Sequence, residues 1–388
     1  MAVSKIGMRK AWFQIHKWIG LLLAIAIIPI CFTGAALVWK DALDRTVNPA
    51  RFATSGAEAT RPVSEYAAAA AKVLAPGERV MSVRFSEDAG PVVVTAAQPA
   101  KPGAGGRPVR TMVWLDPGTT QVLDKANSSD GLIRVFHVIH GSLMLPGVGR
   151  KVVGWIGVAM LISSISGIWL WWPTVGKWVR GLRWRRHNNL DTNLHHMMGF
   201  WISVPLFILS FTGVWISFPP FFAKLSGAET QQKQGSEKKG AEKKGAGPGR
   251  MQAQPLETTV QGADGAVSAA VDQVAGTPVL VAWPTDQKAE WEVSLKPAEG
   301  PASSVTVDDA TGEAKVEKPR PQRNGIARTM RRIHDGNGMG ALWQTIVFLG
   351  GLLPTILAIT GVIMWWRARS WRGKLKQRQV AAAARQRA

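Results

Sequence analysis

Four long apolar runs are the feature that most limits what this chain can fold into. A helix needs about 20 predominantly apolar residues to cross a hydrocarbon core roughly 30 Å thick. Four segments meet that length, and tryptophans cluster at their ends, as in the aromatic belts of membrane proteins. The segments are Trp18–Trp39, Val152–Trp172, Gly199–Phe218 and Leu342–Trp366. They predict a mainly α membrane protein with four transmembrane helices.

Basic residues gather beside these runs and predict how the chain is oriented. The sequence holds 47 Lys and Arg against 26 Asp and Glu, a net charge of +21. Lys and Arg crowd the segments before the first run, between the second and third, and after the fourth, where Asp191 is the sole acid. Cytoplasmic segments carry such an excess. We therefore expect both termini and the middle loop on the cytoplasmic side of a bacterial inner membrane. The charge then suits the lipid bilayer and does not indicate nucleic-acid binding.

Two pairs of segments repeat each other without a gap. "IHKWIGLLLAIAIIPICFTG", from Ile15, matches "LHHMMGFWISVPLFILSFTG", from Leu194. A second pair begins at "IHG" and "IHD" and ends at "SGIWLWW" and "TGVIMWW". The four helices are thus predicted to form a duplicated two-helix unit.

The two long connections between the runs are each predicted to form a small periplasmic α+β domain. Each has a helix candidate, from Val63 and from Ala266, followed by three strand candidates. The strand candidates begin at Arg79, Pro91, Arg110, Pro278, Glu290 and Ser303. A Gly- and Lys-rich stretch at 231–250 has no residues for a core and is predicted to be a disordered tether.

These observations give a complete predicted organisation. In chain order it is a cytoplasmic N-terminus with helix 1 (1–40), a periplasmic domain (41–130), a surface helix with helix 2 (131–173), a basic loop (174–194), helix 3 (195–218), a second periplasmic domain (219–330), a surface helix with helix 4 (331–366) and a basic tail (367–388).

Each repeat returns a histidine to the same position, and four histidines at matched positions indicate a metal centre. His16 matches His195 just before helices 1 and 3, and His140 matches His334 before helices 2 and 4. The orientation places the first pair at the inner face of the membrane and the second at the outer face. Glycines after His140 and His334 should interrupt the chain there and leave both residues on short surface helices. Paired imidazoles from facing helices are typical ligands of b-type haem, so we expect two haems.

The neighbouring residues leave some alternatives open. His137, three residues before His140, is an alternative ligand or a contact of a haem propionate. Arg134, Arg331 and Arg332 are further candidate contacts of a propionate, as cations. His196 is the alternative to His195, which is favoured because His196 faces elsewhere on the helix. His187, in the basic loop, is expected to meet solvent or lipid headgroups. Non-haem metal is less favoured because carboxylates and cysteines, its usual further ligands, are nearly absent around the histidines. The repeated Thr-Gly and Ser-Gly pairs inside the runs are interpreted as helix-packing residues.

The motifs "IHKWIG", "SGIWLWWP", "VDDATGE" and "TGVIMWW", in this order along the chain, resemble the PepSY-associated transmembrane helix family over nearly the whole chain. Within it the chain is similar to the di-haem inner-membrane reductases of ferric siderophores such as ferrioxamine. That resemblance implies two haems, a periplasmic ferric siderophore as substrate and a role in iron acquisition. The 231–250 stretch departs from the family pattern, so the substrate identity stays open.

The functional hypothesis is electron transfer across the membrane to Fe(III) in a periplasmic chelate. No dinucleotide-binding motif occurs, so the electron donor is expected to be a quinol or a separate reductase. The alternative is a haem-free, membrane-anchored PepSY protein that regulates or inhibits an extracytoplasmic protease. A permease is less favoured because no acidic residue lies inside a predicted span.

Overall fold

A computed structural model describes residues 5–86, 89–98, 109–172, 177–183, 187–226, 253–317 and 325–387. The predicted tether at 231–250 lies outside these residues. The chain divides into two compact units, a helical one and one built on a β-sheet. Each unit is described by itself.

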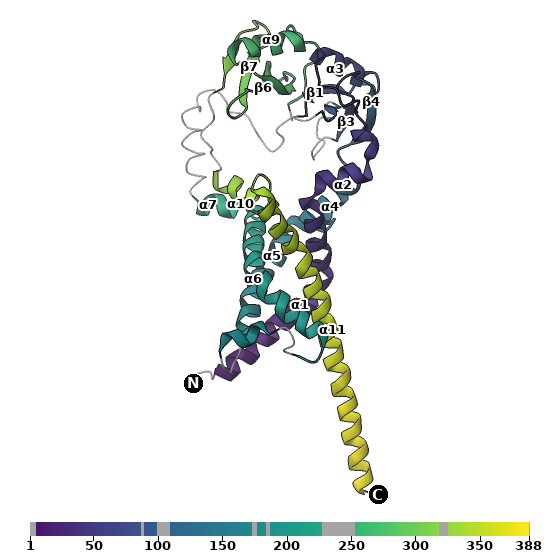
Figure 1. The fold of residues 1–388 in the computed structure, drawn as a ribbon, viewed down its shortest axis with the longest axis vertical. Helices are drawn as coiled ribbons and strands as arrows, with labels where there is room; N and C mark the ends of the chain where they lie inside the picture. The colour runs from purple at the N-terminus through teal and green to yellow at the C-terminus, as the bar shows by residue number, and fades with distance from the viewer. Residues whose placement is uncertain are drawn as a thin grey trace. The chain divides into compact units, whose positions relative to one another are not determined.

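The helical unit contains four helices long and apolar enough to cross a membrane (Figure 1). Their apolar side chains point outward, since Ile25 is 87% and Leu342 79% exposed, which is the pattern of helices that face lipid. The protein is a multi-pass membrane protein. The helices of the unit are α1 (Lys5–Val38), α4 (Leu132–Ser142), α5 (Gly149–Trp171), α6 (Leu190–Ser217), α7 (Pro219–Leu225), α10 (Gly325–Asp335) and α11 (Gly340–Arg387), with a short 3-10 helix η2 (Trp178–Leu182).

Three of the long helices run well beyond the apolar stretches that predicted them. Helix α1 begins at Lys5, α6 begins at Leu190, and α11 continues through the basic tail, where it extends from the bundle as a single helix (Figure 1). The residues of the α11 tail are mostly Lys, Arg, Gln and Ala, which are good helix formers. Because α1 and α6 begin early, His16 and His195 lie inside these helices, not before them.

The short helices α4 and α10 end at backbone positions that no helix tolerates. Three glycines after α10 have positive φ: Gly336 at 76°, Gly338 at 68° and Gly340 at 81°. After α4, Leu143 and Met144 take φ values of 50° and 58°. Left-handed residues stop a right-handed helix. His140 and His334 therefore sit on separate short helices, as the glycine pattern indicates.

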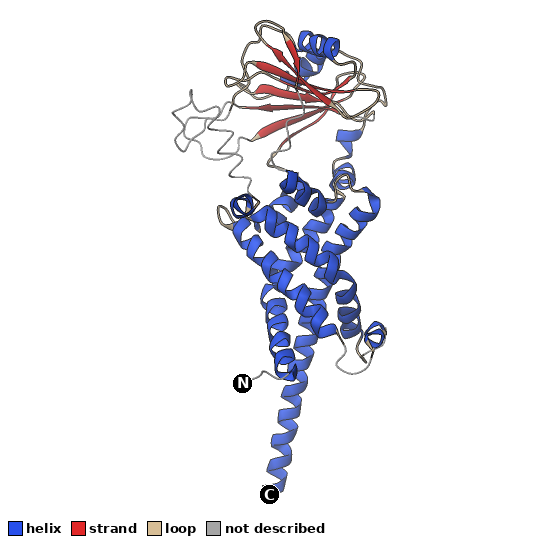
Figure 2. Cartoon of the chain, turned by 90° about the vertical axis from the view of Figure 1, so that its left-hand side faces the viewer, coloured by secondary structure: helices blue, strands red, loops and turns tan. Residues whose placement is uncertain are grey.

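The sheet unit joins the two predicted α+β segments into one eight-stranded antiparallel sheet (Figure 2). Its order is β4-β3-β2-β1-β5-β6-β7-β8, so the two four-stranded halves meet where β1 pairs with β5, with Val83 opposite Val281. Pairing the two inner edges removes two exposed strand edges. The strands are β1 (Arg79–Arg84), β2 (Val92–Ala97), β3 (Arg110–Leu115), β4 (Val122–Asn127), β5 (Thr277–Ala282), β6 (Glu290–Lys296), β7 (Ser303–Asp308) and β8 (Ala314–Val316). The fourth strand of each half, β4 and β8, is absent from the sequence prediction.

Helices α3 (Val63–Ala71) and α9 (Ala263–Gln273) cover one face of this sheet, and the core of the unit lies between them (Figure 2). The chain's only tyrosine, Tyr66, is fully buried there and donates a hydrogen bond from Oη to the carbonyl of Pro117. Trp291 is almost fully buried, and its Nε1 donates to Oδ1 of Asp309 at 2.9 Å. Both large rings thus satisfy their polar atoms inside an apolar core. Before the sheet, α2 (Lys40–Val47) and a 3-10 helix η1 (Pro49–Phe52) lead into the unit.

Asp116 holds the turn between β3 and β4. Its carboxylate accepts hydrogen bonds from the backbone and hydroxyl groups of both Ser55 and Thr119. Burial opposes ionisation, but these donors outweigh it and lower the pKa of Asp116 to about 2. Asp308 makes the matching turn after β7, with Thr311 in the place of Thr119.

The low pKa predicts an acid-sensitive sheet unit. A carboxyl whose pKa is lower in the folded than in the unfolded chain stabilises the fold above about pH 4, and that contribution is lost as pH falls from about 4 to about 2. Asp116→Asn should therefore flatten the fall in melting temperature over this range, measured by circular dichroism of the β-sheet band in the full-length protein. Asp272→Asn, at an exposed position of α9, is the control and should keep the wild-type slope. Identical slopes for wild type and Asp116→Asn would contradict the assignment.

Candidate metal centres

The structure brings His16 of α1 and His195 of α6 together. Their ring centroids are 6.3 Å apart and their planes are nearly perpendicular, at 89°. Each ring is held by a hydroxyl from a neighbouring helix. Nδ1 of His16 lies 3.0 Å from Oγ of Ser166 on α5, and Nδ1 of His195 lies 3.0 Å from Oγ1 of Thr360 on α11.

His140 of α4 and His334 of α10 form a second pair. Their centroids are 5.9 Å apart, with an angle of 41° between the planes. Nδ1 of His140 donates to the backbone carbonyl of Ile30 on α1 at 2.8 Å. Nδ1 of His334 donates to the carbonyl of Leu209 on α6 at 3.1 Å and lies 3.0 Å from Oγ1 of Thr212.

These partners fix which ring nitrogen of each histidine carries the proton. A carbonyl oxygen only accepts, so His140 and His334 must donate from Nδ1. The hydroxyls of Ser166 and Thr360 already donate to carbonyls of their own helices, which leaves them as acceptors for His16 and His195. In the part of the chain that the structure describes, every hydrogen bond of these four rings uses Nδ1. The lone pair of each ring is therefore on Nε2, the nitrogen left for a metal.

Glycines allow the rings of His140 and His334 to lie close to the helices that they contact. A Cβ on Gly34 would lie 2.6 Å from Cε1 of His140, and one on Gly213 would lie 3.1 Å from Cε1 of His334. Both glycines come four residues after the carbonyl that the ring reaches, Ile30 and Leu209. Without a side chain at the glycine, the helix surface is open and the imidazole can reach that carbonyl.

The rings of the inner pair, His16 and His195, also lie against glycines. Gly167 lies against His16 and Gly361 against His195, each with a Cβ position 3.4 Å from Cε1. Oγ of Ser163, four residues before Gly167, also lies 3.4 Å from Nδ1 of His16. The Thr-Gly and Ser-Gly pairs, interpreted from sequence as packing residues, are thus the surfaces on which all four histidines rest. Their gapless recurrence in the repeats was the signal for this role.

Both pairs have the spacing of two imidazoles that share one metal ion. A metal lies about 2 Å from the imidazole nitrogen it binds, and the ring centroid lies about 1 Å further on, so two opposed rings have centroids roughly 6 Å apart. The observed values are 6.3 and 5.9 Å. Among the described residues no group of three or more His, Cys, Asp or Glu side chains gathers in one place. A metal ion at either pair would therefore meet two imidazoles and no third His, Cys, Asp or Glu among the described residues.

A comparison with protein-family models assigns nearly the whole chain to one family. Residues 13–368 match the model of the PepSY-associated TM region, PepSY_TM, which covers both histidine pairs and the sheet. The protein belongs to the PepSY-associated TM family. Comparison with curated proteins finds no matching relative.

The two other histidines proposed as ligands of this PepSY-associated TM protein lie outside the pairs. His137 is exposed on α4, one turn before His140. His196 turns away from its neighbour His195 and packs against His187, with ring centroids 4.6 Å apart. His187, expected to meet solvent or headgroups, is half-buried by this contact. The geometry thus selects His195 over His196 and His140 over His137 as members of the facing pairs.

The outer pair lies outside the four candidate spans, and its surroundings keep it uncharged. Burial lowers the pKa of both imidazoles, and the neighbouring His140 contributes to lowering that of His334, to about 3. Burial disfavours the charged form of Asp335 too, and for a carboxyl this raises the pKa; the nearby charge of Arg331 opposes that rise. Neutral imidazole is the form that binds metal, so the outer pair is held in the ligating state.

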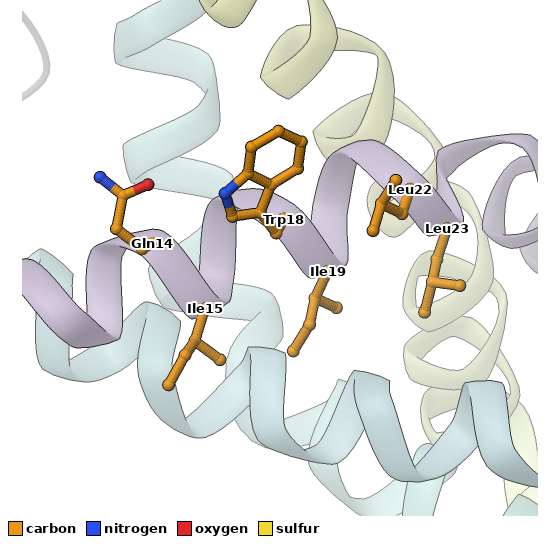
Figure 3. Close-up of a pocket in the computed structure, with 6 residues that line it drawn as sticks. All are labelled: Gln14, Ile15, Trp18, Ile19, Leu22 and Leu23. Atoms are coloured by element: carbon orange, nitrogen blue, oxygen red, sulfur yellow. The ribbon is translucent and has the colours of Figure 1, made fainter.

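A shallow apolar pocket on α1 has no histidine among its lining residues (Figure 3). It is lined by side chains of α1, namely Gln14, Ile15, Trp18, Ile19, Leu22 and Leu23. Trp18 and Leu22 are 49% and 69% exposed. This surface suits acyl chains of the bilayer and contributes no ligand to the inner pair.

The close packing at Gly34 predicts that alanine there destabilises the protein more than alanine at Gly361. In Gly34→Ala the new Cβ would collide with the His140 ring, so the ring must shift and its hydrogen bond to Ile30 weakens. We expect a loss of about 1–3 kcal/mol in unfolding free energy, typical of overpacking. Unfolding of the purified protein in mixed detergent micelles, followed by circular dichroism, measures it. Gly361→Ala, where the contact is an ordinary 3.4 Å, is the control and should lose far less. Equal losses in the two variants would contradict this account of Gly34.

Proposed function

We propose that this protein is a haem-containing inner-membrane reductase that passes electrons across the membrane to Fe(III) in a periplasmic ferric siderophore. The observation that carries the proposal is the set of two facing imidazole pairs. In each pair both rings donate from Nδ1, and the centroids lie at the spacing of two axial ligands.

The residues around the pairs fit b-type haem better than a bare metal ion. His16 and His195 would hold one haem, and His140 and His334 a second. A bare ion would need further protein ligands, which the described residues do not gather, whereas the macrocycle brings its own four nitrogens. A Cβ on Gly20, one turn after His16, would meet no protein atom within 4 Å, so the space beside that ring is open. Bound haem supplies a one-electron carrier at each pair.

The spacing of the pairs along the bundle supports transfer across the membrane. On α1, His16 and the contact of His140 at Ile30 are 14 residues apart, about 21 Å of helix. The matched contacts made by both repeats lead us to infer that the bundle is a duplicated two-helix unit. The basic flanks support a cytoplasmic location for the His16–His195 end and a periplasmic one for the sheet unit.

Ferric iron in a chelate is the acceptor that the proposal requires at the outer end. A donor, either a membrane quinol or a separate reductase, loses one electron and the ferric ion gains it. Fe(II) is a softer ion than Fe(III) and is bound less tightly by the hard oxygen donors of siderophores, so the reduction releases iron for uptake. The protein's residues contribute by fixing the ring orientation at both ends and by excluding water from the buried rings.

The alternative, a haem-free regulator of an extracytoplasmic protease, leaves the imidazole geometry without a role. Four half-buried rings in facing pairs, each with Nε2 free of a described hydrogen-bond partner, are costly in a bundle that needs only packing. A purified protein with no haem absorbance would favour the regulator.

Substitution of one histidine in each pair tests the ligand assignment. His16→Ala and His140→Ala should each lose about half of the haem, because a site with one axial ligand holds it weakly, and the double variant should lose nearly all. The measurement is the pyridine haemochrome absorbance per protein, with dithionite-reduced spectra as the second readout. His137→Ala, exposed on the same helix as His140, is the matched control and should keep its haem. Full haem content in the double variant would overturn the assignment.

A further inference from the structure

The outer end of the helical unit carries a cluster of exposed cations beside the His140–His334 pair. Arg328, Arg331 and Arg332 on α10 are all exposed, and none forms an ion pair with a described residue. Arg332 is oriented by a hydrogen bond from Nη2 to the carbonyl of Gly338. Arg331 lies one helical turn before His334, close enough for its charge to act on that ring.

The balance of charge at this end is strongly positive. Three more exposed cations, Arg150 and Lys151 at the start of α5 and Lys224 on α7, belong to the same end. Among the described residues of the helical unit the only acids are Asp191 and Asp335. Asp191 pairs with Arg367 on the cytoplasmic side, which leaves Asp335 alone against six cations here. A field of one sign around an exposed site raises the local concentration of molecules of the opposite charge.

Membrane insertion does not explain these arginines. Lys and Arg are retained on the cytoplasmic side, whereas the outer side normally lacks them. Arginines on a surface helix at the outer face are the opposite of this distribution. We therefore expect them to have a function there. Arg331 lies one helical turn from His334, in the pair proposed to reduce the ferric chelate. This position suggests that the arginines act on the chelate.

We propose that the surface formed by Arg328, Arg331 and Arg332 docks ferric chelates of net negative charge. This proposal rests on the proposed reductase function and names the substrate class of its outer site. Anionic chelates, such as carboxylate or catecholate complexes, are attracted to the surface, while cationic hydroxamate complexes are repelled. The electron balance is unchanged: one electron leaves the reduced protein, and Fe(III) in the docked chelate becomes Fe(II).

Reoxidation kinetics with acceptors of opposite charge test the proposal. The full-length protein, purified in a nonionic detergent and reduced with dithionite, is mixed in a stopped-flow instrument with ferricyanide, Fe(III)–EDTA or the cationic cobalt(III) tris(bipyridine). The rates with the two anions should fall as ionic strength rises, and the rate with the cation should rise. In Arg328→Gln/Arg331→Gln the rates with the anions should drop roughly tenfold at low ionic strength and converge with wild type at high ionic strength.

A matched variant locates the surface. Arg372→Gln/Arg378→Gln removes the same charge from exposed positions of the basic tail of α11 and should leave the rates with the anions unchanged. A fall in this variant alone would place the exchange at the cytoplasmic end and overturn the proposal. Loss of haem in Arg328→Gln/Arg331→Gln would assign the arginines to haem propionates and also overturn it.

The remaining outcomes separate this proposal from the proposed function. A colourless protein, or one that no acceptor reoxidises, defeats the reductase function itself. A coloured protein whose reoxidation shows no preference for charge defeats only the docking surface. An effect of the arginine substitutions that appears only after phosphatidylglycerol is added would assign the surface to lipid headgroups and likewise overturn the proposal.

Discussion

The hydrogen bond from Nδ1 of each histidine to an acceptor on a neighbouring helix is the constraint on which the account depends. It fixes the tautomer, restrains the direction of the ring and leaves the lone pair on Nε2. A glycine lies against each of the four rings, and at the two outer sites it comes one turn after the accepting carbonyl and lets the ring reach it. Partners of this kind tune the ligand and its affinity for metal by about 10- to 100-fold, so the Ser/Thr-Gly surfaces belong to the sites as much as the histidines do.

The same contacts tie the bundle together. Helix α1 supplies His16 to one pair and the resting surface of His140 to the other, and α6 does the same with His195 and the surface of His334. Helices α1 and α6 therefore each take part in both ends of the unit. Helices in a membrane gain little from apolar contact with one another, so close packing at glycine and interhelical hydrogen bonds contribute much of their association. The packing and the proposed chemistry depend on the same residues.

Sequence patterns predicted the parts that local chemistry determines. Hydrophobic length located the four spans, and the gapless repeats located the four histidines. The patterns did not show which helix each ring rests on, because the contacts of His16 with Ser166 and of His195 with Thr360 join positions 150 and 165 residues apart. The β1–β5 pairing that unites the sheet was missed for the same reason. The repeat alignment and the helix face favoured His195 over His196, and the structure shows that the His195 ring faces His16 while His196 packs against His187.

The central claim is that each histidine pair binds one iron through two imidazoles. Electron paramagnetic resonance of the oxidised protein tests it most directly, because two axial imidazoles make ferric haem low-spin. The account predicts two low-spin signals, and they should differ because the ring planes are nearly perpendicular in the inner pair and at 41° in the outer pair. A high-spin ferric signal, or no ferric haem signal at all, would contradict it.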